Sequence, residues 1–537
     1  MKKLPTFYYW QHFNEFLSYF DEQQQSLPQD LLDFIDGYYQ LPYPQQCIIA
    51  RLSQKKYTVF CRNKLDYPEI TDFTGNLTRL IQSGWIIPVN LDSLYDVIGG
   101  LNKKDIESLF IQCRKKPSSS YSKKQLACWL DQFKREKQYS MPEQEEILQW
   151  AFAEQLRSLF LISFGTLENP FYRFVMRDLG LSKVGSFESS SGIRFNHHND
   201  VVLAYYFAKL LLELSQTPHE ILSKQVLKLP DSMHLDINRL KDRYLFELGK
   251  KLMATNELFA FHCLSRSNKF EALELWTKEK IKRNQFKEVN CRFVQLINIT
   301  QDRKLTLFIQ DIQNRYFSKK PLSLAQERMR QCDLLVELPV CYKNRIEAGV
   351  IDYFHKTNRR AWFTENHLWK SLFALTFWPI LFKKRYFFHP FQRLPQCLRN
   401  NSFYTLESRN IEKICTLLST KLTAKKWIRK QFEKHYGQSN GIFSWSDDLI
   451  DLLDILLENS PSQSIMTLLR LMAKDFKNLT VGFPDLMIQE QDRLVFIEVK
   501  GPSDSLRFNQ LFTQNQLIEI GFNIDILKVK WQKMQHT

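Results

Sequence analysis

The sequence predicts a multidomain protein of the α + α/β class, and three observations support this prediction. The 537 residues exceed what one hydrophobic core usually organises, which indicates three or four domains. Residues 145–350 carry long amphipathic helical patterns with few glycines. Residues 480–529 combine two short β-rich runs, a helical segment and a further β-rich run, an alternation typical of an α/β domain.

The composition favours a polyanionic partner. Lysine and arginine outnumber aspartate and glutamate by 74 to 58, which gives a formal charge of +16. Such a surplus, on a background of 25% charged residues, suits nucleic acid, and an anionic membrane surface also fits it. No segment reaches the roughly 20 apolar residues that span a bilayer, and the N-terminus shows no apolar signal region. We expect no membrane partner.

The cysteines indicate a reducing compartment. The chain has 10 of them, scattered without any CxxC pair. A disulfide framework or a zinc site would require regular or paired spacings, so free core thiols are expected. The sequence therefore predicts a cytoplasmic protein, associated with the nucleoid if it is bacterial.

Residues 1–95 are expected to form a domain that is helical at first and then wing-like. Helical patterns and short β-rich runs alternate in it, with helices at 31–39, 47–52 and 72–81 and strands at 55–60 and 85–89. Asp72 is placed to cap the last of these helices. This order resembles a winged helix, and a small α/β packing module fits it as well.

Residues 96–142 are expected to form two short helices joined by a basic, serine-rich turn. The turn and its flank carry Lys115, Lys116, Lys123 and Lys124. Serine hydroxyls, helix N-termini and lysines all suit contacts with phosphate. The segment resembles a SAP-type DNA-binding hairpin, with a solvated charged loop as the alternative.

Residues 143–350 are expected to form a helical solenoid that links the two ends of the chain. Helix pairs follow one another, with clear apolar faces at 201–214 and 270–282. No clean repeat of about 34 residues recurs, so a regular tetratricopeptide array is not supported. An irregular, TPR-like array is the prediction.

The motif that carries chemistry lies in residues 480–500, TVGFPDLMIQEQDRLVFIEVK. A hairpin centred on Gln491-Asp492 would place Asp485 opposite Glu498. Side chains alternate along a strand, so Glu498 and Lys500 would share one face with Asp485. Two carboxylates offer hard oxygen ligands to Mg²⁺ or Mn²⁺, and a lysine can orient or deprotonate a water. The alternative is an exposed hairpin with a solvated Glu–Lys pair.

This arrangement matches the PD-(D/E)xK nuclease pattern. Its fuller wording, GFPDL…FIEVKGPSD, resembles the virus-type replication-repair nuclease (VRR-NUC) domain of the Fanconi-associated nuclease family, in a short, bacterial-like form. The resemblance implies a restriction-endonuclease-like α/β core over 351–537. It also implies 5′-flap endonuclease and 5′-to-3′ exonuclease activity in DNA (interstrand crosslink) repair, with one or two Mg²⁺ or Mn²⁺ ions per site.

The resemblance further implies a set of site residues. The metal ligands would be three carboxylates and one backbone carbonyl, from Glu365, Asp485, Glu498 and Val499. Lys500 would be the catalytic base or the group that orients the nucleophile. Glu365 is placed by its segment, TENHLW, which precedes the apolar run LFALTFWPILF.

The chain departs from the family pattern in its basic residues. After E-V-K-G-P the family commonly shows an arginine and then a Lys-Gln pair, whereas this chain has Ser505 and Asn509-Gln510. Lys477, just before the PD motif, and Arg507 are therefore the cations expected to contact a 5′ phosphate.

Two other classes of function stay open. One is a junction resolvase or restriction-type endonuclease on the same core, and the other is a non-catalytic DNA-repair scaffold. The intact set of Asp485, Glu498 and Lys500 favours an enzyme. The expected partner is branched or flapped double-stranded DNA, and the sequence indicates no particular protein partner.

Overall fold

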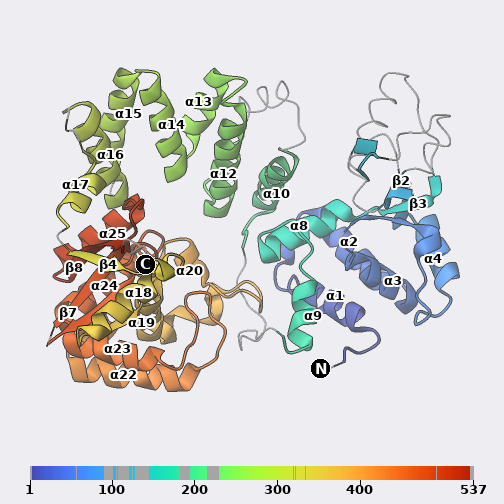
Figure 1. Ribbon diagram of the computed structural model, residues 1–537. Coiled ribbons are helices and arrows are strands. Elements are labelled where there is room, and N and C mark those ends of the chain that lie inside the picture. The colour runs from blue at the N-terminus through green and yellow to red at the C-terminus, as the bar shows by residue number, and fades with distance from the viewer. Residues whose placement is uncertain are drawn as a thin grey trace. The chain divides into compact units, whose positions relative to one another are not determined.

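A computed structural model gives the fold of the chain (Figure 1). The structure describes residues 3–55, 57–89, 144–181, 194–214, 229–300, 302–318, 322–332, 334–491 and 493–532, with Lys320 and a few positions between 101 and 126. One compact unit holds the described residues up to 244, and a second holds those from 245 on. Among the described residues, no helix is both long enough and apolar enough to cross a membrane.

The N-terminal unit begins with helices and a small sheet. The first helices are α1 (Tyr8–Ser18), α2 (Gln29–Gln40), α3 (Tyr43–Ser53) and α4 (Phe73–Gln82). The carboxylate of Asp72 accepts a hydrogen bond from the N–H of Gly75, which confirms the predicted cap of α4. The sheet is antiparallel, in the order β1-β3-β2, with β1 at Val59–Cys61, β2 at Ile86–Val89 and β3 at Gln144–Trp150.

The third strand of this sheet corrects the sequence analysis. We predicted helices from residue 145 onward, but Leu148 pairs with both Phe60 and Pro88 as the central strand of the N-terminal sheet. A strand that is paired on both sides gains its stability from distant partners, which local helical patterns do not reveal. The unit continues with α8 (Ala153–Phe164), α9 (Tyr172–Asp178) and α10 (His198–Glu213).

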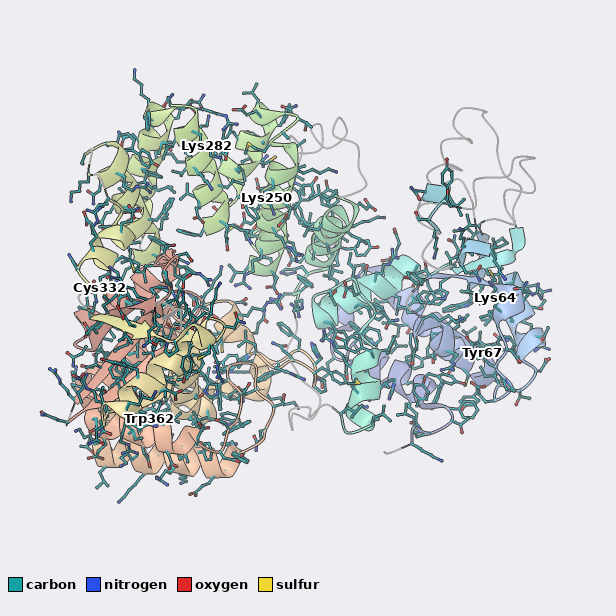
Figure 2. All side chains as sticks on the ribbon, in the orientation of Figure 1. Lys64, Tyr67, Lys250, Lys282, Cys332 and Trp362 are labelled. Carbon is teal, nitrogen blue, oxygen red and sulfur yellow. The ribbon has the colours of Figure 1, made fainter. Side chains whose placement is uncertain are left out.

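The middle of the chain is a series of helices, as predicted. They are α12 (Leu235–Leu252), α13 (Glu257–Arg266), α14 (Phe270–Lys282), α15 (Phe286–Ile299), α16 (Arg303–Tyr316) and α17 (Leu324–Arg330). From α13 to α16 each helix packs against the next, around buried Leu264, Trp276 and Phe293 (Figure 1). Lys250 of α12 and Lys282 of α14 (Figure 2) are exposed lysines on these helices, and each pairs with a glutamate one turn away.

The C-terminal region is built on a mixed sheet of five strands in the order β4-β8-β7-β6-β5. The strands are β4 (Leu334–Leu338), β5 (Arg360–Phe363), β6 (Leu486–Glu490), β7 (Arg493–Lys500) and β8 (Asn523–Trp531). The predicted hairpin is confirmed, with Met487 opposite Phe496. β4, by contrast, lies in the segment that we predicted to be helical. That part of the prediction was wrong because parallel pairing with β8 outweighs the local helical pattern.

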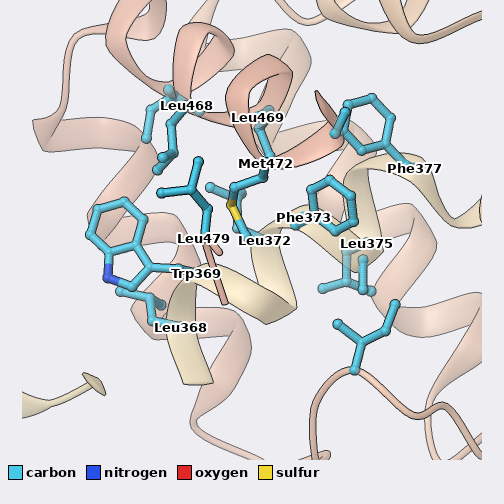
Figure 3. Close-up of a cluster of buried hydrophobic side chains, with 14 of the residues drawn as sticks. Leu368, Trp369, Leu372, Phe373, Leu375, Phe377, Leu468, Leu469, Met472 and Leu479 are labelled. Atoms are coloured by element: carbon cyan, nitrogen blue, oxygen red, sulfur yellow. The ribbon is translucent and has the colours of Figure 1, made fainter. Parts of the chain in front are cut away.

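Helices cover both faces of this sheet. Side chains alternate along β7, so Ile497 and Val499 pack against Val350 of α18 (Ile346–Lys356), and Phe496 faces Trp369 of α19 (Glu365–Leu381) at 4.9 Å between ring centroids. Behind α19 lie α20 (Gln396–Arg399), α21 (Phe403–Leu417), α22 (Lys421–His435), α23 (Leu449–Asn459) and α24 (Ser462–Lys474). Figure 3 shows side chains of α19 and α24 in this core.

The last helix, α25 (Phe508–Glu519), confirms the predicted order of helix, hairpin, helix and strand. Gly521 follows it with φ of +95°, a conformation that ends helices and favours glycine. The cysteine prediction holds only in part. The described cysteines are free thiols, but Cys291 and Cys341 are exposed and do not lie in the core.

Candidate active site

The candidate site lies where β7 ends, against one face of α25. Phe496, Glu498 and Lys500 point to the same side of the sheet because they alternate with Ile497 and Val499. Gln510 and Gln514 are four residues apart on α25, so they share one face of that helix. The fold therefore brings two amide side chains of a helix to a carboxylate and an ammonium group of a strand.

Glu498 is the centre of this group. Its side chain is fully buried, at 0% exposure, and it accepts three hydrogen bonds. Nε2 of Gln510 donates at 2.5 Å and Nε2 of Gln514 at 3.1 Å, while Nζ of Lys500 lies 2.9 Å from Oε1. Burial, then the negative charge of Asp485, raises the pKa of Glu498 to about 7, and the Lys500 charge opposes this rise.

Lys500 is buried too, at 6% exposure. Besides Glu498 it contacts Gln510, to whose Oε1 the Nζ donates at 2.9 Å. Gln510 therefore bridges the two residues, accepting from the ammonium group and donating to the carboxylate. Such a bridge fixes both side chains in one geometry, which is what a positioned catalytic group requires.

Asp485 lies across the hairpin from Glu498, one residue beyond the Leu486–Ile497 pair. Its Oδ2 accepts a hydrogen bond from the N–H of Val499 at 2.9 Å. Burial, together with the charges of Glu347 and Glu365, raises the pKa of Asp485 to about 6, against the effects of the Val499 N–H and of Lys500. The two neighbouring carboxylates thus hold their protons more tightly than usual. A divalent cation bound between them would stabilise the ionised form of both.

Glu365 opens α19, as predicted, with a left-handed φ of +35°. Its backbone N–H donates to the carbonyl oxygen of Asp485 at 3.0 Å, and the N–H of Thr364 donates to the same oxygen at 2.9 Å. Its carboxylate accepts a hydrogen bond from Asn366 at 2.8 Å. Glu365 is thus held next to the PD strand through its backbone, and its charge acts on both Asp485 and Glu498.

The structure brings Asp485, Glu498 and Lys500 together, and it only partly supports the larger predicted ligand set. In the part of the chain that is described, no three His, Cys, Asp or Glu side chains gather closely enough to hold an ion. The donor chemistry nevertheless suits a hard divalent cation, since buried carboxylate oxygens with raised pKa values are available from two strands. A metal role for Glu365 and for the Val499 carbonyl stays a prediction.

Three residues of the site were missed. Gln510 and Gln514 were not assigned roles, although their four-residue spacing after the E-V-K segment was visible. Glu347, in the first turn of α18, acts electrostatically on Asp485. It was missed because residues 334–350 were expected to belong to the helical middle, not to the sheet domain.

The predicted basic residues lie at several places. Lys477 and Arg507 are both exposed, the first between α24 and β6 and the second at the start of α25. Lys123 is partly buried. Lys115, Lys116 and Lys124, with most of the predicted hairpin over 96–142, lie outside the described residues.

Comparisons with known proteins agree with this geometry. Residues 419–531 match the VRR-NUC domain model, and residues 7–87 match the model of the FAN1 HTH domain. The chain is 24% identical over 553 aligned residues to a Fanconi-associated nuclease 1 homolog of Pseudomonas aeruginosa, which covers 98% of this chain and 96% of that protein. The chain is similar to the Fanconi-associated nucleases. Two domain models in the expected order and a relative aligned along its length support this similarity.

Fanconi-associated nuclease 1 homologs of other organisms match about a third of the chain. A homolog of Schizosaccharomyces pombe is 27% identical over 35% of this chain, and one of Arabidopsis thaliana is 26% identical over 31%. The alignments span only 27% and 20% of those longer proteins. The fold agrees as well. A crystal structure of paFAN1 bound to 5′-flap DNA superposes with a TM-score of 0.83 at 20% identity, covering 99% of this chain and 100% of that one.

The matched nuclease domain and the aligned relative give the general activity. The chain is a DNA-binding nuclease of DNA repair, a hydrolase that cleaves phosphodiester bonds and depends on a divalent metal ion. The family's nuclease domain contains Asp485, Glu498 and Lys500, all within the residues that match the VRR-NUC model. Glu365 lies upstream of the matched range.

Proposed function

We propose that this nuclease cuts branched DNA near a 5′ flap and trims strands in the 5′-to-3′ direction, in the repair of interstrand crosslinks. The observation that carries the catalytic part is the buried cluster of Asp485, Glu498 and Lys500 at the end of β7. The substrate part rests on the relatives, since paFAN1 has been crystallised with 1-nucleotide and 2-nucleotide 5′-flap DNA.

The proposed metal is Mg²⁺ or Mn²⁺, because carboxylate oxygens are the ligands that these ions prefer. Asp485 and Glu498 would hold it, with Glu365 and the carbonyl of Val499 as further ligands. When bound, the ion would supply Lewis-acid polarisation of the scissile phosphate and neutralise its developing charge.

The protein's own groups would do the rest. Lys500, held by Gln510, would orient the attacking water or take its proton, and its charge would offset the negative charge gathering on the phosphate. Gln510 and Gln514 would keep Glu498 in place, because both donate to its oxygens. Burial would exclude bulk water and so strengthen each of these contacts.

Recognition of the 5′ end is proposed for Lys477 and Arg507, which flank the hairpin in sequence. Lys304 of α16 is a further cation in this region. Burial lowers its pKa and so does the charge of Lys477, while the nearby acids Glu271, Asp302 and Asp475 raise it.

The selectivity can be tested with the 5′ end alone. Lys477→Ala combined with Arg507→Ala should weaken cutting of 5′-phosphorylated flaps more than cutting of 5′-hydroxyl flaps. Lys474→Ala is the matched control, because this lysine lies in the same segment but packs over the ring of Tyr404 at 4.7 Å. Equal loss on the two substrates would assign the pair to general backbone binding.

The substrate class needs a separate experiment. Rates of cutting should be compared for a 5′ flap, a nicked duplex, a 3′ flap and a four-way junction of the same sequence. Preference for the 5′ flap is the expected result. Preference for the junction would favour a resolvase, and no cutting of any substrate in the presence of Mg²⁺ or Mn²⁺ would favour a scaffold.

The division into four domains, 1–95, 96–142, 143–350 and 351–537, is kept as a proposal with two changes. The strand Gln144–Trp150 joins the first domain, and the nuclease domain begins near Leu334, because β4 pairs with β8. A nuclease that repairs chromosomal DNA would work at the nucleoid of a bacterial cytoplasm.

A further inference from the structure

The last helix of the chain, α25, contacts both the carboxylate site and the helical middle, which consists of α12 to α17. Gln510 and Gln514 lie on the face of α25 that contacts Glu498. At about 3.6 residues per turn, Phe508 and Leu511 lie on the other side of the helix. There they pack against apolar side chains of α16 and α17 (Figure 1). α25 thus connects the helical middle to the site.

Phe508, the first residue of α25, is held by two rings of the helical middle. Its ring stacks on that of Phe270, the first residue of α14, with 5.8 Å between the centroids and 16° between the planes. The ring of Phe308 of α16 meets Phe508 edge-on at 5.9 Å, and it meets Phe270 at 5.2 Å. Stacked and edge-to-face pairs are the favourable arrangements of aromatic rings, so the three rings hold one another in a defined geometry.

Gln510 lies two residues after Phe508, in the same turn of α25. Its side chain accepts a hydrogen bond from Nζ of Lys500 at 2.9 Å and donates one to Glu498 at 2.5 Å. Hydrogen bonds weaken steeply when their geometry is distorted. A small displacement of the first turn of α25 would therefore weaken the contacts that hold Glu498 and Lys500.

The same helix also holds the loop that precedes Asp485. Oγ1 of Thr513, which is fully buried, donates to the carbonyl oxygen of Val481 at 2.8 Å. Gly482 lies so close to α25 that a Cβ at this position would overlap with the carbonyl oxygen of Asn509. A shift of α25 would therefore disturb both strands of the hairpin that carries the carboxylates.

We propose that Phe508 is a positioning residue of the nuclease site. By stacking on Phe270 it fixes the first turn of α25 relative to the helical middle, and Gln510 passes this position on to Glu498 and Lys500. The inference rests on the proposed role of these two residues in cleavage. Phe270 should then affect cleavage too, although it belongs to the helical middle and not to the sheet domain.

The test is a double-mutant cycle in the full chain, with Phe508→Ala, Phe270→Ala and both changes together. The substrate is a 5′-hydroxyl flap, so that the proposed contact of Arg507 with a 5′ phosphate is not scored. Each single variant should lower kcat about tenfold and leave KM within about twofold, as expected when a supporting group is lost. The double variant should lose no more than about twofold beyond either single variant, because both changes break the same contact.

Phe286→Ala is the matched control. Phe286 is likewise the first residue of a helix of the middle, α15, and is likewise partly buried, but its ring contacts are with Tyr316 and Phe317 at the end of α16. Its loss should leave kcat within about twofold of the wild type, because it is independent of α25. Phe270→Ala also tests the contact from the side of α14 if Phe508→Ala does not fold.

Amide hydrogen exchange of the metal-free protein provides a measurement that does not depend on cleavage. Peptides from 481–485 and 508–514 should exchange faster in Phe508→Ala and Phe270→Ala than in the wild type or in Phe286→Ala. A wild-type protein that does not cut flap DNA would contradict the proposed function, whereas the exchange would still decide this inference. Wild-type kcat and exchange in Phe508→Ala or Phe270→Ala, equal effects of Phe286→Ala, or multiplied losses in the double variant would each overturn the proposal.

Discussion

The backbone N–H of Glu365 donates to the carbonyl oxygen of Asp485 at 3.0 Å, which ties the start of α19 to the strand that carries the PD motif. Asn366 strengthens this link, because its Oδ1 accepts from the N–H of Phe483 and its Nδ2 donates to the Glu365 carboxylate. The left-handed φ of Glu365 costs about 1–2 kcal/mol for a residue with a Cβ. The surrounding hydrogen bonds hold the residue in this conformation and so fix its carboxylate near Asp485.

The strained backbone at Glu365 gives the first prediction. Glu365→Ala and Glu365→Gly both remove the carboxylate and should lower flap cleavage by about 100-fold or more. The glycine variant should be more stable to urea than the alanine variant by about 1 kcal/mol, because glycine tolerates a positive φ. Cleavage at the wild-type rate by either variant would mean that the third acid lies elsewhere, with Glu347 the next candidate.

The raised pKa values give a prediction about pH. Burial raises the pKa of Asp485 to about 6 and of Glu498 to about 7, above the usual values of carboxyl groups. Between about pH 4 and 7 the folded state therefore binds more protons than the unfolded state. The free energy of unfolding of the metal-free protein should then decrease as the pH rises through this range. Urea unfolding in EDTA at several pH values should show this loss.

The same two groups make metal binding dependent on pH. Ions compete with protons for the carboxylates, so the affinity for Mn²⁺ should increase as the pH rises from about 6 to 8. Calorimetric titration of wild-type protein measures it. In Glu498→Gln most of this increase in Mn²⁺ affinity with pH should disappear. If the affinity of that variant depends on pH as in the wild type, Glu498 does not take part in metal binding.

Gln510 gives a prediction about positioning. Gln510→Ala removes the bridge between Lys500 and Glu498 and should reduce cleavage about 10- to 100-fold, the usual effect of losing such a supporting group. The pH optimum of cleavage should shift as well, because Gln510 donates to the titrating Glu498. A residue with only a structural role would leave the optimum unchanged. Asn515→Ala, a change on the same helix away from Glu498, is the control. A normal rate and a normal pH profile for Gln510→Ala would contradict the role.

The basic hairpin predicted over 96–142 gives a prediction about salt. Neutral substitutions at Lys115, Lys116, Lys123 and Lys124 together should flatten the dependence of DNA affinity on salt, by about 0.9 in slope for each lysine–phosphate ion pair that the substitutions remove. Fluorescence anisotropy with duplex DNA at several salt concentrations measures this slope. If the slope stays unchanged, the duplex is held by another domain.

Local patterns were sufficient to predict the elements that carry the motif. The hairpin register, the helix that begins at Glu365 and the glycine that follows α25 depend on alternation, apolar spacing and turn residues close in sequence. β3 and β4 were missed because their pairing partners are distant in the chain. Gln514 was missed for a related reason, since its role depends on α25 packing over β7.

The most direct test of the central claim is flap cleavage by Asp485→Asn and Glu498→Gln, measured together with DNA binding. Both changes keep the shape of the side chain and remove its charge, so cleavage with Mg²⁺ or Mn²⁺ should drop by at least about 100-fold, while flap DNA still binds. Glu490→Gln is the control, because this glutamate lies on the same hairpin but pairs with Arg359 and Arg493. Loss of cleavage in the first two variants only is the result we predict. Cleavage close to the wild-type rate in either of them would contradict the assignment of the active site.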